Sequence, residues 1–318
     1  MMLIKRSYPA LLILPVVAVF SIVSSCKQHQ QKNTISISGA FALYPLTVKW
    51  AEEYRKLHPE ITIDVSAGGA GKGMTDVLSD MVDLAMFSRS VSQEEMDKGA
   101  WMIAVSRDAV VPMINSANTH INELKKRGLK QSEFIDIYFN KKYSTWNAII
   151  GLPGNDKLNI YTRSDACGAA EMWGKYLGKN QENLDGIGVF GDPGMADAVR
   201  KDPYGLGYNN VIYAYDIKTR KTYEGLEVVP IDINSNGVID LEEDFYSSLD
   251  SIMAAIRDRR YPSPPARDLF LISHGSPKKE AVRKFLQWIL TEGQKYINDA
   301  GYVQLQPTQI ESEKEKLK

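Results

Sequence analysis

The chain has 318 residues, of which 44% are hydrophobic and 24% are charged, and its formal net charge is −1. This length suggests about two structural units, because a domain typically has roughly 150 residues. The near-neutral charge argues against a nucleic-acid partner, since nucleic acid is bound through a basic face that releases counterions.

The first 25 residues are predicted to be a signal peptide. Lys5 and Arg6 precede an apolar run at 10–23, which is shorter than the roughly 20 residues that a membrane span needs. The run ends in Val-Ser-Ser-Cys, which resembles a bacterial lipoprotein box with Cys26 as the lipidated residue. Residues 26–33 would then be a polar tether. A plain secretory signal or a short anchor helix is the alternative.

A lipidated Cys26 has two consequences. The mature chain is expected outside the cytoplasm, in the periplasm or at the cell surface, and attached to a membrane. The sequence contains only one other cysteine, Cys167, so no intrachain disulfide is expected.

Three segments share one plan, which is a short strand, a turn of small residues and a helix. The strands are expected at 35–39, 61–65 and 158–162. The first N–H groups of a helix have no intrahelical partner and lie at its positive dipole end. The three turns are therefore candidate anion-binding corners.

The second of these turns, SAGGAGKG at 66–73, is the most glycine-rich stretch. It does not match a nucleotide-hydrolase phosphate loop, which would need Gly at position 66 and Ser or Thr at position 73. It is either a flexible turn or a backbone cradle that opens a helix. The expected helix has apolar residues at 74, 77, 78, 81 and 82 on one face.

Two arginines stand where strands are expected to end. Arg89 follows a buried strand at 83–88, and ligands of open α/β sheets bind at the carboxyl ends of strands. The alternative for Arg89 is a surface position. Arg163 precedes a helix N-terminus, so a bidentate cation and free N–H groups would lie together. Asp165 is expected either to cap that helix or to orient Arg163.

The rest of the chain supplies a second lobe and a return. Residues 102–114 are predicted to form one or two strands that cross between lobes, and helices are expected at 121–128 and 131–139. Residues 268–274 are predicted to be a returning strand. The charged tail at 311–318 is expected to be frayed.

Residues 232–243, DINSNGVIDLEE, match the calcium-loop pattern D-x-[DN]-x-[DN]-G-x5-E in full. These hard oxygen ligands suit a structural Ca²⁺, and no cofactor for chemistry is expected. The stretch resembles an EF-hand loop, although the preceding segment reads as a strand. A metal-free surface turn is the alternative. The ligands that the pattern assigns are Asp232, Asn234, Asn236, the carbonyl of Val238, Asp240 and Glu243.

Several of these stretches together resemble the periplasmic phosphate-binding proteins of ABC importers, the PstS type. They are GAFALYPLTVKWAEEY, GGAGKGM with DLAMFSRSVS, RSDACGAAEMW, LGYNNVIYAY and the closing RDLFLISHG with VRKFLQWILTEGQKYINDAGYV. Their order and spacing carry the resemblance over nearly all of the mature chain. It implies an α/β, type II periplasmic binding protein fold, with two lobes of mixed sheet joined by hinge strands. Lobe 1 is expected at 34–108 and 268–318, and lobe 2 at 109–267.

The resemblance implies a function as well as a fold. A lipid-anchored monomer would hold phosphate or a similar oxyanion between its lobes and deliver it to ABC permease subunits. The ligand-binding residues expected from the family's motifs and from the helix N-termini are Ala40, Phe41, Ala42, Ala70, Gly71, Arg89, Arg163, Cys167, Gly168 and Ala169.

The chain departs from the family at several of these positions. Members usually carry Ser or Thr hydroxyls where this chain has alanine or cysteine, and many have a proton-accepting Asp where Arg89 stands. Each hydrogen bond to a charged group contributes about 1.5–3 kcal/mol, so the missing hydroxyls weaken phosphate binding unless backbone N–H groups and two arginines offset the loss. Phosphate, another anion and a degenerate member used for signalling remain alternatives.

Two other classes of function are weighed against the binding protein. Cys167 at a helix N-terminus could be the nucleophile of a hydrolase, but none of the four histidines has a triad spacing. A calcium-stabilised sensor or adhesion module would show no closure on a ligand. A binding protein without enzymatic activity is the main expectation.

Overall fold

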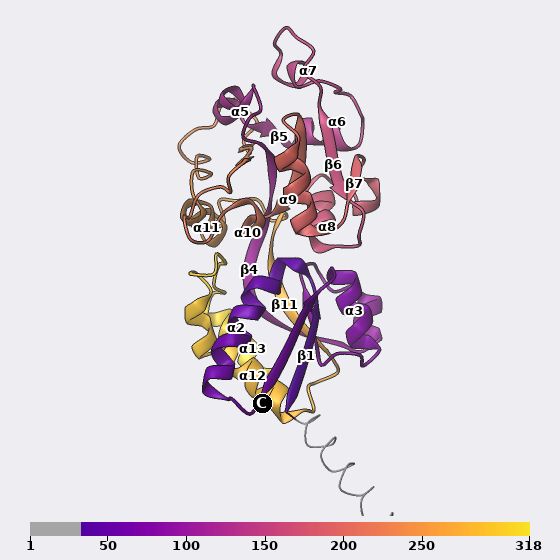
Figure 1. Cartoon of the computed structure of the whole chain (residues 1–318), viewed down its shortest axis with the longest axis vertical. Coiled ribbons are helices and arrows are strands. Elements are labelled where there is room, and N and C mark those ends of the chain that lie inside the picture. The colour runs from indigo at the N-terminus through magenta and orange to yellow at the C-terminus, as the bar shows by residue number, and fades with distance from the viewer. Residues whose placement is uncertain (1–32) are drawn as a thin grey trace, which may run out of the picture.

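The computed structural model describes residues 33–318, so the predicted signal peptide and the lipidation residue Cys26 lie outside the described residues. Two hydrophobic cores divide the molecule (Figure 1). One core draws mainly on residues 35–105 and 269–317, which we call lobe 1. The other draws mainly on residues 109–266, which we call lobe 2. No helix among the described residues is both long and apolar enough to cross a membrane.

Lobe 1 is built on three parallel strands. The first, β1, lies between β2 and β3 and is parallel to both. Helix α2 packs beside α12, where Tyr54 makes edge contacts with Phe285 and Trp288. Helix α3 contacts β1 and β3. The elements of this lobe are β1 (Thr34–Gly39), η1 (Phe41–Leu43), α2 (Tyr44–Leu57), β2 (Thr62–Ala67), α3 (Ala70–Leu78), β3 (Leu84–Phe87), α4 (Gln93–Asp97), α12 (Glu280–Ile289), η3 (Glu292–Tyr296) and α13 (Pro307–Glu315).

Two long strands connect the lobes. They are β4 (Ala100–Asn115) and β11 (Ala266–His274), which pair antiparallel to each other. The first part of β4 belongs to lobe 1, and its last part pairs with β8 of lobe 2. All the larger strands therefore form one continuous mixed sheet in the order β2-β1-β3-β11-β4-β8-β6-β7, with β9 also on β4. The domain boundaries expected at 108–109 and 267–268 fall within these two strands.

Lobe 2 repeats the parallel arrangement, because β6 is parallel to both β7 and β8. Its core contains the Trp173 ring stacked on Tyr208, with Phe134 edge-on to Trp173. Its elements are α5 (Ile121–Arg127), β5 (Leu129–Lys130), α6 (Gln131–Tyr138), α7 (Trp146–Ile150), β6 (Asn159–Arg163), α8 (Gly168–Tyr176), η2 (Gln181–Asn183), β7 (Ile187–Val189), α9 (Gly191–Lys201), β8 (Gly205–Asn210), α10 (Val211–Ala214), β9 (Leu226–Val228), β10 (Ile231–Asp232) and α11 (Leu249–Arg257).

The predicted fold class, two α/β lobes with mixed sheet and hinge strands, is confirmed. Two local predictions are wrong. The C-terminal tail is not frayed, because α13 docks on β4, where the Glu313 carboxylate accepts the Ala104 N–H at 3.1 Å. The helix α3 ends at Leu78, and Met81 is 74% exposed rather than on the inner face.

Candidate functional site

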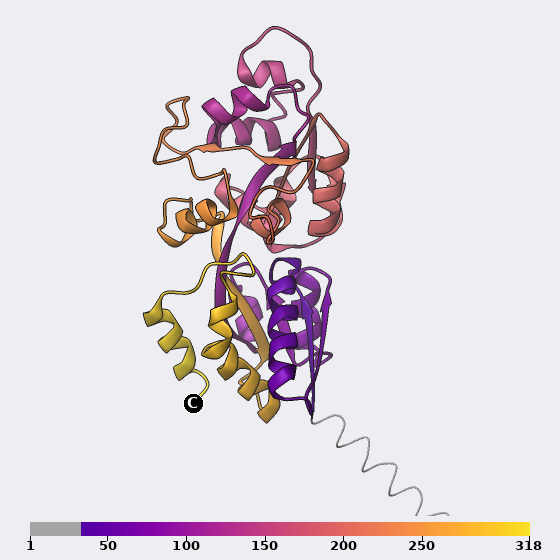
Figure 2. The same cartoon turned by 60° about the vertical axis from the view of Figure 1, so that its left-hand side comes forward.

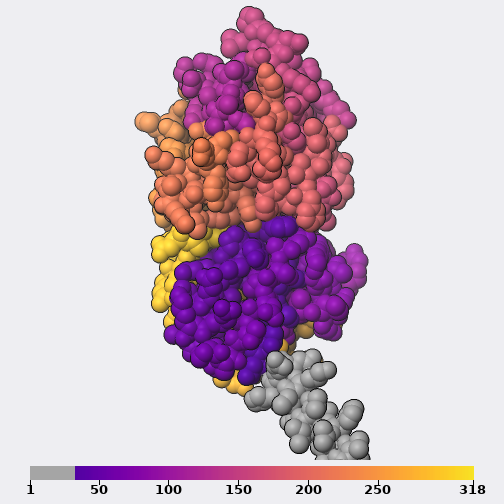
Figure 3. All heavy atoms as spheres, viewed as in Figure 1, coloured from indigo at the N-terminus to yellow at the C-terminus, as the bar shows by residue number. Residues whose placement is uncertain are grey.

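The parallel strands of both lobes run toward the boundary between the lobes, where we place the candidate ligand cleft (Figure 2). Lobe 1 presents the ends of β1, β2 and β3, and lobe 2 presents the ends of β6, β7 and β8. This is the place where open α/β sheets bind ligands. The lobes abut along a waist (Figure 3), and the residues that line the cleft are largely buried. The structure is therefore a closed form.

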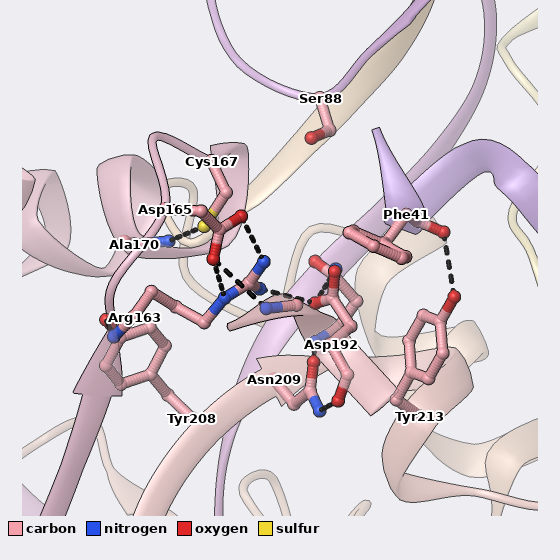
Figure 4. A network of polar contacts seen from close by, with 12 residues as sticks. Phe41, Ser88, Arg163, Asp165, Cys167, Ala170, Asp192, Tyr208, Asn209 and Tyr213 are labelled. Carbon is pink, nitrogen blue, oxygen red and sulfur yellow. Dashed lines mark hydrogen bonds and ion pairs between the residues drawn. The ribbon is translucent and has the colours of Figure 1, made fainter. Parts of the chain in front are cut away.

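Arg163 is the central charge of the lobe 2 side, and its side chain is fully buried. Asp165 binds one edge of the guanidinium, with 2.8 Å from Nε to Oδ1 and 2.7 Å from Nη2 to Oδ2. Asp192 forms an ion pair with Nη1 at 3.0 Å (Figure 4). Nη1 itself has no hydrogen bond among the described residues. Nη1 thus faces the Asp192 carboxylate as an ion pair without a hydrogen bond of good geometry.

The core of lobe 2 fixes the backbone at this arginine. The Tyr208 hydroxyl accepts the Arg163 N–H at 3.2 Å and lies 2.9 Å from the Thr162 hydroxyl. Asp165 does not cap α8, because the N-cap is Cys167, whose Sγ accepts the Ala170 N–H. Of the two roles expected for Asp165, the structure therefore favours orienting Arg163. The same carboxylate also accepts the Gly191 N–H at the start of α9, at 3.1 Å.

A second buried ion pair lies at the hinge. Arg267 of β11 is 3.1 Å from the Asp108 carboxylate of β4 and donates to the Ser88 carbonyl at 3.2 Å. It also donates to the Asn210 side chain. Burial raises the pKa of Asp108 to about 7, against the lowering effect of Arg267. Burial likewise raises the pKa of Asp192. Arg267 therefore links both lobes through the hinge.

Lobe 1 contributes backbone and small residues to the cleft. Ala40, Ala42 and Ala70 are 2%, 1% and 0% exposed. Helix α3 begins at Ala70, and the Gly71 N–H donates to the Ala166 carbonyl of lobe 2 at 3.3 Å. At the other side of the cleft the Tyr213 hydroxyl donates to the Phe41 carbonyl at 3.1 Å (Figure 4). The Phe41 ring meets Phe190 edge-on.

Gly168, the first residue of α8, lies directly against lobe 1. A Cβ atom built on it would overlap the side chain and the carbonyl of Ser88. The close approach of the two backbones thus requires glycine at position 168. It also places the Ser88 hydroxyl beside the first N–H groups of α8, at Gly168 and Ala169.

Arg89 is held within lobe 1. Its guanidinium binds Glu95 of α4 through two hydrogen bonds of 3.0 and 2.7 Å and lies over the Phe87 ring at 4.5 Å. The side chain is 22% exposed. The charge of Arg89 is thus paired with a neighbour of its own lobe.

Cys167 is buried in the cleft wall, and its thiol is held in the protonated form. Burial raises the pKa of Cys167 to about 12, although the nearby Arg163 lowers it. A nucleophilic cysteine needs a depressed pKa, which this environment does not provide. The geometry does not favour the hydrolase alternative.

Sequence reasoning missed four polar residues of the cleft. Ser88 stands one residue before the arginine that was singled out, and Arg267 one residue before the predicted returning strand. Asp192 lies in a Gly- and Pro-rich stretch without periodicity, and Asn210 is the last residue of β8. The signal that all four share is their position at the end of, or inside, a central strand or at a helix start. The six predicted calcium ligands lie apart from the cleft, in the loop between β10 and α11.

This architecture defines the class of protein: a two-lobed, type II binding protein with its ligand cleft at the hinge. The chain belongs to the PBP superfamily, because the family model described as PBP superfamily domain matches residues 27–292. The resemblance to the PstS-type phosphate-binding proteins is confirmed as well. The chain is 26% identical over 351 residues to the phosphate-binding protein PstS of Methanocaldococcus jannaschii, covering 92% of this chain and 90% of the relative.

Other relatives agree. Protein SphX of Synechococcus elongatus is 25% identical, over 93% of this chain and 85% of that protein. Among solved structures, a candidate phosphate ABC transporter substrate-binding protein with bound phosphate from Clostridium perfringens superposes with a TM-score of 0.71 at 18% identity, covering 86% of this chain and all of that one. An ABC-type phosphate transport receptor from Vibrio cholerae gives 0.62 at 17% identity, over 85% of this chain and all of that one. These two likenesses bear on the fold.

Proposed function

We propose that the protein is an extracytoplasmic solute-binding protein that captures phosphate or a similar tetrahedral oxyanion and delivers it to an ABC importer. The observation that carries the proposal is the meeting of three groups in the closed cleft. These are the guanidinium of Arg163, whose Nη1 faces Asp192, the N-terminus of α8 at Gly168, and the N-terminus of α3 at Ala70. Each of them favours negative charge. The relatives named as phosphate-binding proteins support the choice of phosphate.

The mechanism follows from where these groups sit. Arg163 and the α8 N-terminus belong to lobe 2, and the α3 N-terminus belongs to lobe 1. An anion that contacts both lobes binds the closed form better than the open form, and only this difference in affinity shifts the equilibrium. Strands β4 and β11 are the elements that would bend. An importer subunit would then recognise the closed conformation.

The charges of the cleft restrict how an anion is bound. Asp165 accepts both hydrogen bonds from the Nε–Nη2 edge of Arg163. This edge can therefore bind an anion in bidentate fashion only if Asp165 moves away. The ligand would instead accept from Nη1, from backbone N–H groups and from the Ser88 hydroxyl. Protonation of Asp192 or Asp108, which their raised pKa values favour, reduces the repulsion that a dianion would meet.

The proposal includes the membrane anchor argued from the sequence. The Val-Ser-Ser-Cys motif at 23–26 would attach lipid to Cys26, and residues up to 33 would tether lobe 1 to the membrane. Intact-mass measurement of the mature protein tests this part, since a diacylated Cys26 adds a lipid mass that Cys26→Ser removes. An unmodified mass with the leader cleaved elsewhere would contradict it.

Isothermal titration of the protein with phosphate, sulfate, arsenate, molybdate and tungstate tests the function. We expect phosphate or one of the other oxyanions to bind, and Arg163→Ala to weaken it at least 100-fold. The variant loses the charge-assisted hydrogen bond from Nη1, worth about 1.5–3 kcal/mol, and leaves Asp165 and Asp192 to repel the anion, and each 1.4 kcal/mol is tenfold. The missing hydroxyls leave the choice among the anions to this measurement.

Matched variants keep the result interpretable. Arg163→Ala leaves two buried carboxylates without their cation, so Arg163→Lys, which keeps the charge, is measured beside it. Arg127→Ala removes a guanidinium from lobe 2 away from the cleft, where it pairs with Glu133, and should bind like the wild type. The function is refuted if no oxyanion binds the folded wild-type protein. The site is wrong if folded Arg163 variants bind as tightly as the Arg127 variant.

A further inference from the structure

The loop of residues 232–243 is a feature that anion binding does not explain. It joins β10 to α11 in lobe 2 and packs beside α5, where the Ile239 N–H donates to the Lys126 carbonyl at 2.8 Å (Figure 1). It carries four carboxylates within twelve positions, and the first and the last of them are buried. Asp232 is 1% exposed and Glu243 is 5% exposed.

Backbone N–H groups hold these two buried carboxylates in place. The Asp232 carboxylate accepts the N–H groups of Asn236 at 3.1 Å and Gly237 at 2.8 Å. One oxygen of Glu243, Oε1, accepts the N–H groups of Ile233 and Asn234, both at 2.9 Å. Both ends of the twelve-residue pattern are thus turned toward the inside of the loop.

The remaining carboxylate oxygens lack partners. Glu243 Oε2 and Asp240 Oδ1 are buried, and neither has a hydrogen-bond partner among the described residues. A buried carboxylate oxygen without a partner costs free energy, and native proteins satisfy nearly all such groups with a hydrogen bond, a water or an ion. Two such oxygens in one loop point to a cation as their missing partner.

The two asparagines of the pattern converge on the same place. The side-chain nitrogens of Asn234 and Asn236 lie 3.0 and 3.4 Å from Asp240 Oδ2. An amide turned by 180° about its last torsion presents oxygen where nitrogen stood, with nearly the same shape. In the observed orientation their side-chain oxygens accept the N–H groups of Asn236 and Val238 at 3.0 and 2.8 Å, so a turned amide would give up these two bonds to offer its oxygen to a cation near Asp240.

We propose that this loop is a Ca²⁺ site. The ligands would be carboxylate oxygens of Asp232, Asp240 and Glu243, the amide oxygens of Asn234 and Asn236, and the carbonyl of Val238. This all-oxygen set of six to seven donors on a flexible loop suits Ca²⁺, whereas Mg²⁺ demands near-ideal octahedral geometry and retains its waters. No histidine or cysteine occurs at 232–243, which disfavours zinc and copper.

Binding would tighten the loop. Among residues 33–318 no group of three or more His, Cys, Asp or Glu side chains is assembled for a metal ion, so the three carboxylates do not yet converge on one point. A cation would draw Asp240 and Glu243 toward Asp232 and clamp the loop on α5. The loop belongs to lobe 2 and does not reach the cleft, so Ca²⁺ would stabilise the lobe and leave anion affinity unchanged.

Thermal unfolding of the chelator-treated full-length protein tests the site, with CaCl2 and MgCl2 titrated separately. Extracellular loops of this kind bind Ca²⁺ with dissociation constants on the order of 0.1–1 mM. At 10 mM Ca²⁺ we expect the Tm to rise by about 5 °C, and by much less with Mg²⁺. Calorimetry with CaCl2 gives the dissociation constant directly, and phosphate titration with and without Ca²⁺ should give the same affinity.

Three variants decide whether this loop is responsible. Glu243→Gln keeps an acceptor for the two N–H groups but removes the charge. It should lower the affinity for Ca²⁺ at least tenfold. Asp240→Asn removes a ligand charge at a half-exposed residue. It therefore provides the decisive measurement in the event that Glu243→Gln does not fold. Asp244→Asn removes a neighbouring exposed carboxylate outside the ligand pattern and should respond like the wild type. A wild-type protein with no Ca²⁺ response, or an unchanged response in the Glu243 and Asp240 variants, overturns the proposal.

Discussion

The two edges of the cleft are built from opposite kinds of residue. Lobe 2 presents side-chain charge, with Arg163 between Asp165 and Asp192. Lobe 1 presents mainly backbone and small residues, because Ala40, Ala42 and Ala70 offer no polar side-chain atom, and Ser88 adds a hydroxyl. One lobe can thus fix the sign of the ligand's charge while the other can close over it through main-chain N–H groups.

The difference also explains how the lobes fit so closely. Small residues on the lobe 1 edge let the start of α8 approach until Gly168 touches Ser88. Larger hydroxyl-bearing residues would fill part of that space. The small residues at the edge of lobe 1 therefore have two effects. They let the lobes approach closely, and they expose main-chain N–H groups to the ligand.

The largest expected effect comes from breaking the close approach. Gly168→Ala places a methyl group onto the Ser88 backbone, which cannot move aside as a flexible side chain would. We expect the lobes to stay apart and anion affinity to fall at least 100-fold, about 3 kcal/mol, because closure supplies the lobe 1 contacts. Small-angle scattering with and without anion measures the closure, and calorimetry measures the affinity.

A second, milder glycine substitution shows whether the loss of affinity follows the size of the steric overlap. Gly71→Ala faces the exposed Ala166, where the added methyl would lie 3.1 Å from the Ala166 Cβ. A shift of a few tenths of an ångström relieves that contact, so the loss should be clearly smaller than for Gly168→Ala. Wild-type affinity in both variants would show that the anion does not need the closed cleft.

A smaller effect is expected at the charged hinge. Asp108 has a raised pKa of about 7 because it is buried, whereas an unfolded Asp titrates near 4. The folded state therefore keeps a proton that the unfolded state loses. The stability from this proton is full below pH of about 4 and is lost as the pH rises through about 7.

Urea unfolding at pH 5 and pH 8 measures this contribution. The wild type should be less stable at pH 8, by an amount on the order of 2 kcal/mol, and Asp108→Asn should remove most of the difference. The other groups with a shifted pKa, including Asp192, are common to both proteins. An equal pH difference in the two proteins would assign it to another group.

The sequence was informative about the fold because its signals are local. Strand, small-residue turn and helix recur three times, and each of these units is present with its helix start near the predicted place. The sequence also indicated Arg163, because an arginine at a strand end before a helix has a clear context. The same reasoning predicted Arg89 as an anion contact. In the structure its guanidinium forms an ion pair with Glu95, six residues further along the chain.

What the sequence could not predict depends on contacts between distant residues. Asp192 meets Arg163 only because β7 is parallel to β6 and α9 starts at its end. The docking of the C-terminal tail rests on Glu313 reaching the Ala104 N–H, which no local pattern reveals. A charged tail looks frayed until the strand that it covers is known.

The smallest expected effect tests whether the backbone edge of lobe 1 is short of a hydroxyl. Ala70 is fully buried at the first position of α3, and its methyl group offers no donor to an anion. Ala70→Ser would add one donor to a bound anion, worth about 1.5 kcal/mol or roughly tenfold in affinity. Without the anion, the same hydroxyl is buried with no ligand to accept from it and should lower the Tm slightly.

The opposite signs of these two effects make the test specific. Ala51→Ser is a buried alanine-to-serine change on α2, away from the cleft. It should lower the Tm without raising the affinity for the anion. If Ala70→Ser behaves in the same way, the anion does not approach the start of α3, and the lobe 1 contact must come from another part of its edge. A gain in affinity at Ala70 alone would show that the main-chain edge of lobe 1 binds the ligand and that its missing hydroxyl limits affinity.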